Sequence, residues 1–165
     1  MKHENVDYKE LAQWIIDRAK SAGADQSFVS LSKNRSVSIS YRDKKLEELK
    51  EATQASLSLQ LYVDHRYSVN STNDLRKESL APFIDEAVAG TKYLSKDMHR
   101  ELTDPSYYPA KTDTDLELVD EKYAALETEK RLQIVKEIEA AAMDASPHLI
   151  TASSYISDGI SESLA

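Results

Sequence analysis

The four histidines are the residues of this chain best suited to bind a metal ion, and their spacing does not favour a metal site. They are spread along the sequence at His3, His65, His99 and His148. A zinc-peptidase helix needs histidine and glutamate within one or two turns of each other. His99-Arg100-Glu101 has suitable residue types without this spacing, so we interpret it as a solvated loop.

An acidic run provides a second candidate site. Asp113, Asp115 and Glu117 alternate as calcium-loop ligands do, but Leu118 stands where such a loop needs glycine for its sharp turn. A solvated acidic loop is therefore the favoured interpretation. No Gly-x-Ser-x-Gly motif is present, and the three glycines are isolated from one another. We expect no catalytic, cofactor-binding or metal-binding residue in this chain.

Contact with a partner is a further role that the sequence suggests. His65, Arg66 and Tyr67 lie at the expected tip of a hairpin, and they are our candidates for contact with a substrate or a partner subunit. The alternative is an ordinary exposed turn, since loop tips are polar for solubility alone. Tyr107 and Tyr108 either contact a partner or pack onto their own domain.

Composition limits the classes of function. The chain has 165 residues and a net charge of -8, with 41% hydrophobic and 30% charged residues. The negative charge argues against direct binding of nucleic acid or of an anionic membrane surface. The absence of cysteine excludes disulfides and thiolate metal sites. The polar N-terminus resembles no signal peptide and no run is long enough to span a membrane, so we expect a cytoplasmic protein.

Residues 55–74 organise the expected sheet. Their apolar residues recur with period two, which is typical of a half-buried strand: Leu57, Leu59, Leu61 and Val63. A polar break at residues 64–66 follows, and the alternation then resumes at Tyr67 and Val69. The pattern predicts a hairpin. Its apolar face must be covered, and helical patterns on both sides of it can do so.

The residues before this hairpin predict a helix and then strands. Apolar residues at helical spacing indicate a helix over about residues 7–22, and Gly23 follows as its C-terminal cap. Period-two patterns then begin at Val29 and again at Val37, separated by residues 33–35. These patterns fit two strands or one long bent strand. Residues 43–45 predict a turn, and residues 46–51 predict an extended edge segment.

The residues after the hairpin predict a helix and then an irregular segment. The helix spans residues 77–94 and begins between Arg76 and Ser79, so that Pro82 stays close to its first turn. Asp74 is a candidate capping residue for it. Residues 95–125 are expected to be irregular.

The C-terminal part predicts one more helix and a second hairpin. The helix spans residues 128–145, and Pro147 stops it from continuing. Its expected buried face is formed by Leu132, Val135, Ile138 and Ala142. Residues 149–156 predict a strand, Asp158-Gly159 a hairpin turn, and residues 160–164 the start of a returning strand. The sequence therefore predicts an α+β fold, a mostly antiparallel sheet covered by about three helices. The short second arm of this hairpin suggests that the chain is part of a longer design.

Several short strings, in their order, resemble the N-terminal region of the TldD/PmbA family, also called the modulator of DNA gyrase family, and its PmbA (TldE) branch in particular. The matching strings cover nearly the whole chain and lie at residues 22–25, 37–42, 59–63, 66–75, 102–105, 115–120 and 153–155. The most specific is Arg-Tyr-Ser-Val-Asn-Ser-Thr-Asn-Asp-Leu at residues 66–75. Where the family often has glycine in the central hairpin, this chain has Ser58, His65 and Ser68.

The resemblance implies a cytoplasmic component of a two-subunit proteolytic complex. In this family the TldD-like subunit binds zinc through a His-Glu-x-x-x-His motif, and the PmbA-like subunit lacks that motif and helps to enclose an unfolded peptide. The motif lies beyond the matched region, so no catalytic residue and no cofactor are assigned to this chain. Whether the chain belongs to an enzyme is open.

Two functions are favoured after the resemblance is considered, ahead of a self-contained enzyme, which no group of residues in the sequence supports. The first is a single N-terminal domain, residues 1–165, that lacks the family's C-terminal domain and shapes the peptide passage or the subunit interface. Its partners would be a TldD-like subunit or a second copy of this chain, together with unfolded peptide. The alternative is a free-standing interaction or regulatory domain without a role in proteolysis. An interface domain should expose an apolar patch when isolated, whereas a free-standing regulator should have a polar surface.

Overall fold

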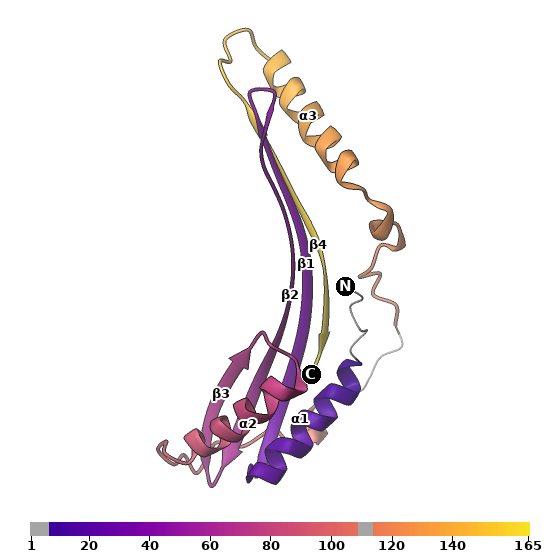
Figure 1. Cartoon of the computed structure of the whole chain (residues 1–165). Helices are drawn as coiled ribbons and strands as arrows, with labels where there is room; N and C mark the ends of the chain where they lie inside the picture. Colours follow the sequence, from indigo (N-terminus) through magenta and orange to yellow (C-terminus); the bar gives the residue numbers. More distant parts are fainter. Residues whose placement is uncertain (1–6, 109–113) are drawn as a thin grey trace. The chain divides into compact units, whose positions relative to one another are not determined.

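Three α-helices and one four-stranded sheet form the framework of this computed structural model, which describes residues 7–108 and 114–165 (Figure 1). The elements follow in the order α1 (Tyr8–Ala22), β1 (Gln26–Arg42), β2 (Lys45–Val63), β3 (Arg66–Thr72), α2 (Lys77–Thr91), η1 (Pro105–Tyr107), η2 (Glu121–Ala125), α3 (Thr128–Asp144) and β4 (Ser153–Leu164). The sheet is antiparallel with strand order β3-β2-β1-β4. The expected α+β class is confirmed.

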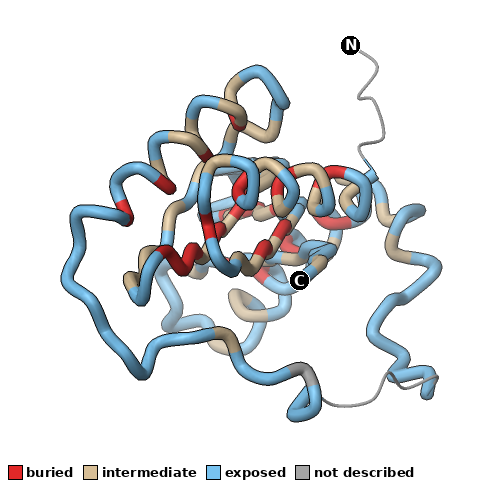
Figure 2. Tube along the Cα trace, turned by 90° about the horizontal axis from the view of Figure 1, so that it is seen from below, coloured by how far each residue is buried: buried red, intermediate tan, exposed pale blue. Residues whose placement is uncertain are grey.

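The chain divides into two compact units, and the long strands contribute residues to both of them. The first unit comprises residues 1–34, 54–108 and 161–165, and the second comprises residues 35–53 and 109–160. Each unit has its own cluster of buried apolar side chains. Figure 2 shows these buried positions along the helices and strands, whereas the chain between α2 and α3 is exposed over most of its length.

The first unit contains the larger core, in which α1 and α2 pack against each other and against the strands. The alternating leucines of β2 are fully buried there, as their period predicts. Their neighbours include Ile15 from α1, Leu31 from β1 and Ile84 from α2. The predicted helix over residues 7–22 is confirmed, because Asp7 caps its first turn and Gly23 ends it with a left-handed φ of 106°.

The second unit has a smaller core beneath α3. Val135 of α3 packs there with Ile39 and Tyr41 of β1, and the partly buried Leu132 and Ile156 complete the cluster. Ser154 on β4 is buried and donates its hydroxyl to the Val135 carbonyl over 2.7 Å. This bond satisfies a polar group that would otherwise be costly inside a core.

The two hairpins end in tight turns built from residues with unusual backbone angles. Asp43 and Lys44 join β1 to β2 with φ of 49° and 59°, and Asp64 and His65 join β2 to β3 with φ of 47° and 59°. Two successive positive φ values match the right-handed twist of the flanking strands. Both predicted turns are confirmed, and β1 is one long strand rather than two.

Replacing Lys44 with glycine should stabilise the protein by up to about 1 kcal/mol, because glycine adopts positive φ without steric cost. The matched control is Lys45→Gly, one residue later in β2, which should instead destabilise it by about 0.5–1 kcal/mol. Urea unfolding followed by circular dichroism measures both. A glycine that destabilises equally at the two positions would contradict this turn geometry.

The second helix begins at Lys77, as predicted, but its capping residue and its end differ from the prediction. α2 has Arg76 at its N-cap, so Asp74 lies two residues too early to cap it. Asp74 instead accepts a hydrogen bond from the Arg76 backbone N–H and pairs with the Arg76 guanidinium, which holds the pKa of Asp74 below its ordinary value. Pro82 is the sixth residue of the helix, just after the first turn, and the helix ends at Thr91 rather than Leu94.

The buried face of α3 is partly polar, which corrects the predicted face. The buried positions are Arg131, Val135 and Glu139, whereas Ile138 is 49% exposed. Glu139 accepts a hydrogen bond of 2.9 Å from the Lys44 backbone N–H in the β1–β2 turn. Because long-range partners satisfy both charged side chains, the helix turns a polar–apolar–polar stripe inward.

The predicted hairpin turn at Asp158-Gly159 is wrong, since β4 runs without interruption from Ser153 to Leu164. A Cβ atom at Gly159 would lie 2.6 Å from the Arg35 carbonyl oxygen. Glycine is therefore required by the close approach of β1 and not by a turn.

No helix among the described residues is long and apolar enough to cross a membrane.

Candidate functional site

The β2–β3 hairpin tip carries the three residues that the sequence singled out as contacts. His65 is the second residue of the turn, and Arg66 and Tyr67 begin β3. Pairing of Tyr62 with Tyr67 and of Val63 with Arg66 fixes the register of the strands up to the turn. The tip therefore has a defined geometry, and the chain that follows α2 reinforces it.

Residues 94–97 close over this tip through backbone and charged contacts. The Asp97 N–H donates to the His65 carbonyl over 2.7 Å, and Arg66 Nε donates to the Leu94 carbonyl over 2.9 Å. Lys96 Nζ donates to Asp64 Oδ1 over 2.7 Å, and Asp64 also pairs with Arg66. The Arg66 side chain is thus committed to internal contacts.

Two tilted aromatic rings and a guanidinium form a cluster beside the tip, on the paired residues Tyr62 of β2 and Tyr67 of β3. The rings of Tyr62 and Tyr67 lie 5.0 Å apart between centroids, and the Arg100 guanidinium lies 4.1 Å from the Tyr67 centroid. Burial, with a smaller contribution from the nearby Tyr67, raises the pKa of the Tyr62 hydroxyl. Tyr67 is therefore held within this cluster, which contributes both apolar burial and cation–π attraction.

His65 differs from its two neighbours, because its side chain is exposed while its carbonyl holds the closing segment. The structure brings Arg66 and Tyr67 into packed positions and leaves His65 facing solvent. The segment that follows α2 exposes several large apolar residues: Tyr93, Leu94, Met98, Tyr107 and Tyr108. Sequence reasoning missed the role of residues 94–100, whose only signal was the number of basic residues among them.

The Asp64 carboxylate gives the tip a measurable pH dependence. Hydrogen bonds from Lys96 and Arg66 hold its pKa at about 2, below the ordinary 3.8. Because the pKa is lower in the folded protein, the contribution of these bonds is complete above about pH 4 and is lost as the pH falls from about 4 to 2.

We expect Lys96→Gln to raise the Asp64 pKa toward 3.8, because it removes the largest single cause of the shift. Carbon-13 NMR titration of the carboxyl group measures this directly. Lys20→Gln, on an exposed position of α1, is the matched control and should leave the value at about 2. An Asp64 pKa near 3.8 in the unaltered protein would contradict the described tip.

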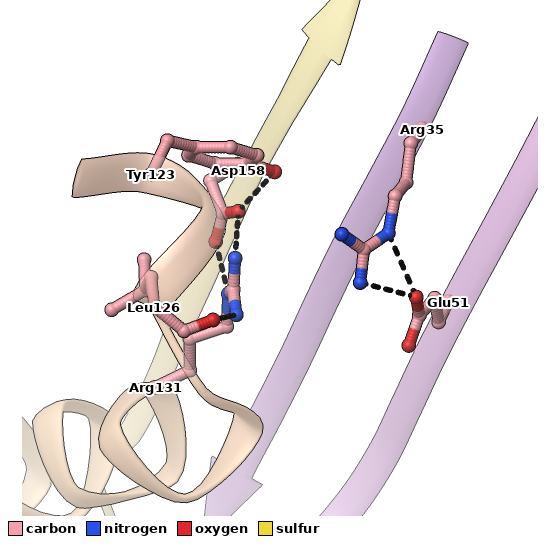
Figure 3. A network of polar contacts seen from close by, with 6 residues as sticks. All are labelled: Arg35, Glu51, Tyr123, Leu126, Arg131 and Asp158. Atoms are coloured by element: carbon pink, nitrogen blue, oxygen red, sulfur yellow. Dashed lines mark hydrogen bonds and ion pairs between the residues drawn. The ribbon is translucent and has the colours of Figure 1, made fainter. Parts of the chain in front are cut away.

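A second polar network lies in the second unit, where it joins η2 and α3 to β4 (Figure 3). Arg131 donates to both carboxylate oxygens of Asp158 over 2.7 and 2.5 Å, and the Tyr123 hydroxyl donates to the same carboxylate over 2.8 Å. Arg131 also donates to the Leu126 carbonyl over 2.5 Å. These contacts fix the beginning of α3.

The described residues offer no zinc site. Within residues 7–108 and 114–165, no group of three or more His, Cys, Asp or Glu side chains is placed to hold a metal ion. The acidic run is only partly described, because Asp113 lies outside the described residues. Zinc therefore does not fit the residues seen, and no chemical step through zinc is assigned to them.

These features define an α+β domain with a long antiparallel sheet and a braced hairpin tip. Residues 29–90 match the family model of PmbA/TldA metallopeptidase domain 1. No curated protein matches the chain.

Solved structures resemble almost the whole chain. A protein described as a modulator of DNA gyrase from Bacteroides thetaiotaomicron is 35% identical, with a TM-score of 0.90 over 97% of this chain and 36% of its own. A Thermotoga maritima protein with the same description is 13% identical, with a TM-score of 0.65 over 94% and 35%. TldE from Thermococcus kodakarensis is 14% identical, with a TM-score of 0.68 over 93% and 34%.

The chain belongs to the TldD/PmbA family, as its motifs indicated. It spans about a third of the length of these three proteins. The two less similar structures support the fold alone.

Proposed function

We propose that this chain acts as the N-terminal domain of a TldD/PmbA-type metallopeptidase component and that it shapes the peptide passage or the subunit interface. The observation that carries the proposal is the match of residues 29–90 to a metallopeptidase domain, together with a 35% identical relative of almost three times the length. In this proposal the catalytic zinc lies outside residues 1–165, and hydrolysis uses water activated by that zinc.

The hairpin tip supports a role in contact rather than in chemistry. Its backbone is held by residues 94–97, so the exposed His65 side chain is presented from a fixed position. The exposed apolar side chains of Tyr93 and Met98 flank residues 94–97 in the sequence, within the first unit. Such a surface suits an interface, since aromatic residues and methionine are enriched there.

The proposed partners are a TldD-like subunit or a second copy of this chain, and the proposed substrate is an unfolded peptide. The PmbA/TldE branch, to which the motif at residues 66–75 is most similar, is the proposed assignment within the family. We place the protein in the cytoplasm. Neither nucleic acid nor a membrane is a proposed partner.

A negative charge introduced at the tip tests this function. In the complete native protein with its partner, His65→Glu should raise KM for an unfolded polypeptide or weaken subunit association while leaving kcat unchanged. The matched control is His148→Glu, which is also exposed but lies in the second unit. A loss of kcat with His65→Glu, or equal effects of both variants, would contradict a contact role for the tip.

A further inference from the structure

The outer edge of β4 pairs with no other strand within residues 7–108 and 114–165. β4 is an end strand of the sheet and spans twelve residues, of which eight are exposed. Proteins usually protect such an edge with lysine, proline, a bulge or a very short strand. β4 contains no lysine, arginine or proline.

The one acidic residue in the part of β4 that belongs to the second unit is half-buried and engaged by internal partners. Asp158 is held by Arg131 and Tyr123 on the α3 side of the strand, where Ser154 and Ile156 also contact α3 or its cluster. Consequently, its charge is neutralised by an internal partner and does not prevent another strand from pairing with the edge.

Gly159 allows β4 to lie close against β1. Its position admits no Cβ on the β1 side, because the Arg35 carbonyl lies 2.6 Å from where that atom would be. With no side chain, Gly159 also presents unshielded backbone to an incoming strand.

Large apolar side chains accompany this edge. Leu149 and Ile150 lie just before β4, and Tyr155 lies within it; all three are exposed, Ile150 at 94% and Tyr155 at 62%. Exposed apolar groups beside free backbone donors and acceptors are the two elements of recognition by strand addition, in which the backbone provides affinity and side chains provide selectivity.

We infer that the edge of β4 binds an extended peptide as a fifth strand of the sheet, and that this peptide carries neutral or basic side chains. The charge preference follows from the second unit, whose sequence has ten Lys and Arg against fifteen Asp and Glu, a net charge of -5. The identity of the occupant as an unfolded peptide rests on the proposed function.

Hydrogen exchange of the β4 amides tests the inference on the full 165-residue chain. The probe is a synthetic nonapeptide of alternating threonine and valine with lysine at each end. At a peptide concentration of ten times Kd, exchange of the β4 amides that face away from β1 should slow by about tenfold. The same peptide N-methylated at alternate residues cannot donate hydrogen bonds from one edge, and it should give no protection.

Two further comparisons separate strand addition from nonspecific adhesion. A probe with glutamate at each end should bind more weakly than the lysine probe. Tyr155→Lys places a like charge on the edge and should weaken binding of the lysine probe, whereas Tyr93→Lys, on an even more exposed tyrosine of the first unit, should not.

Three outcomes would overturn the inference: β4 exchange that the probe does not change, equal binding of the N-methylated probe, or protection that rises with protein concentration alone because a second copy covers the edge. Its failure is distinguishable from failure of the proposed function. Peptide binding by β4 in a protein with no role in proteolysis would leave this inference standing, whereas a proteolytic complex whose β4 ignores peptide would leave only the proposed function.

Discussion

Replacing Arg131 with methionine should lower the free energy of unfolding of the second unit by about 3 kcal/mol. The Arg131 side chain is 3% exposed and neutralises Asp158, which is 21% exposed. Removal of one partner of a buried ion pair leaves the other charge without a partner. Such an unpaired buried charge strongly destabilises the folded state. Methionine keeps most of the side-chain volume, so the loss reports charge and hydrogen bonds rather than a cavity.

A second variant and a control define the origin of this loss. Combining Arg131→Met with Asp158→Leu should recover much of the stability, because both charges are then absent. Arg35→Met removes the neighbouring pair with Glu51, whose side chains are 44% and 46% exposed, and should cost less than about 1 kcal/mol. Figure 3 shows the two pairs together.

The measurement for these variants is hydrogen exchange of the β4 amides in increasing urea. Equal losses from Arg131→Met and Arg35→Met would mean that the Arg131 pair is solvated and not buried. The pair also has a pH signature: the hydrogen bond from Arg131 lowers the pKa of Asp158, so its contribution is lost as the pH falls below the ordinary carboxylate range. Arg131→Met should remove that part of the acid sensitivity.

Replacing Gly159 with alanine should destabilise the second unit by about 2–3 kcal/mol. A Cβ atom 2.6 Å from the Arg35 carbonyl requires β1 and β4 to separate, and backbone cannot move aside as a flexible side chain can. The matched control is Gly90→Ala in α2, where a Cβ would meet nothing within 4 Å. That change should stabilise the helix by about 0.5–1 kcal/mol.

An asparagine at Gly159 distinguishes the continuous strand from a hairpin turn. Asparagine is well tolerated in the left-handed conformation that an Asp-Gly turn requires. In β4 it introduces the same Cβ clash, so Gly159→Asn should cost at least as much as Gly159→Ala. Thermal unfolding by calorimetry measures both variants. An asparagine variant as stable as the unaltered protein would support the turn and contradict β4.

The elements predicted correctly are those whose signals are local. The first helix is bounded by Gly23, and the alternating leucines of β2 bury one face of a strand whatever lies opposite them. The turn at residues 64 and 65 follows from a polar break between two period-two runs. Each of these patterns depends on residues a few positions apart, so a single sequence is enough to predict it.

The errors arose where distant residues decide the outcome. Arg131 and Glu139 occupy the buried face of α3 because Asp158 and the Lys44 N–H satisfy them, and hydrophobic periodicity does not register such partners. Asp-Gly at residues 158 and 159 has the composition of a turn, yet here the aspartate serves an ion pair and the glycine a close strand approach. Both roles depend on contacts with residues far away in the sequence.

The candidate site was predicted in part for the same reason. Placement of His65, Arg66 and Tyr67 at a hairpin tip followed from the local pattern. Their partners in the segment after α2 could not be predicted, because an irregular segment has no period that indicates where it packs. The contact role of these three residues stays a prediction.

The measurement that tests the central claim most directly is the intact mass of the native protein from its source cells, with zinc measured in the same sample. Membership of a family-length metallopeptidase component predicts a mass close to three times the 18.6 kDa of this chain, since the chain spans 34–36% of its solved relatives. Zinc in that sample would make the subunit catalytic, and its absence would make it the non-catalytic partner. A native mass near 18.6 kDa would contradict the account and favour a free-standing interaction domain.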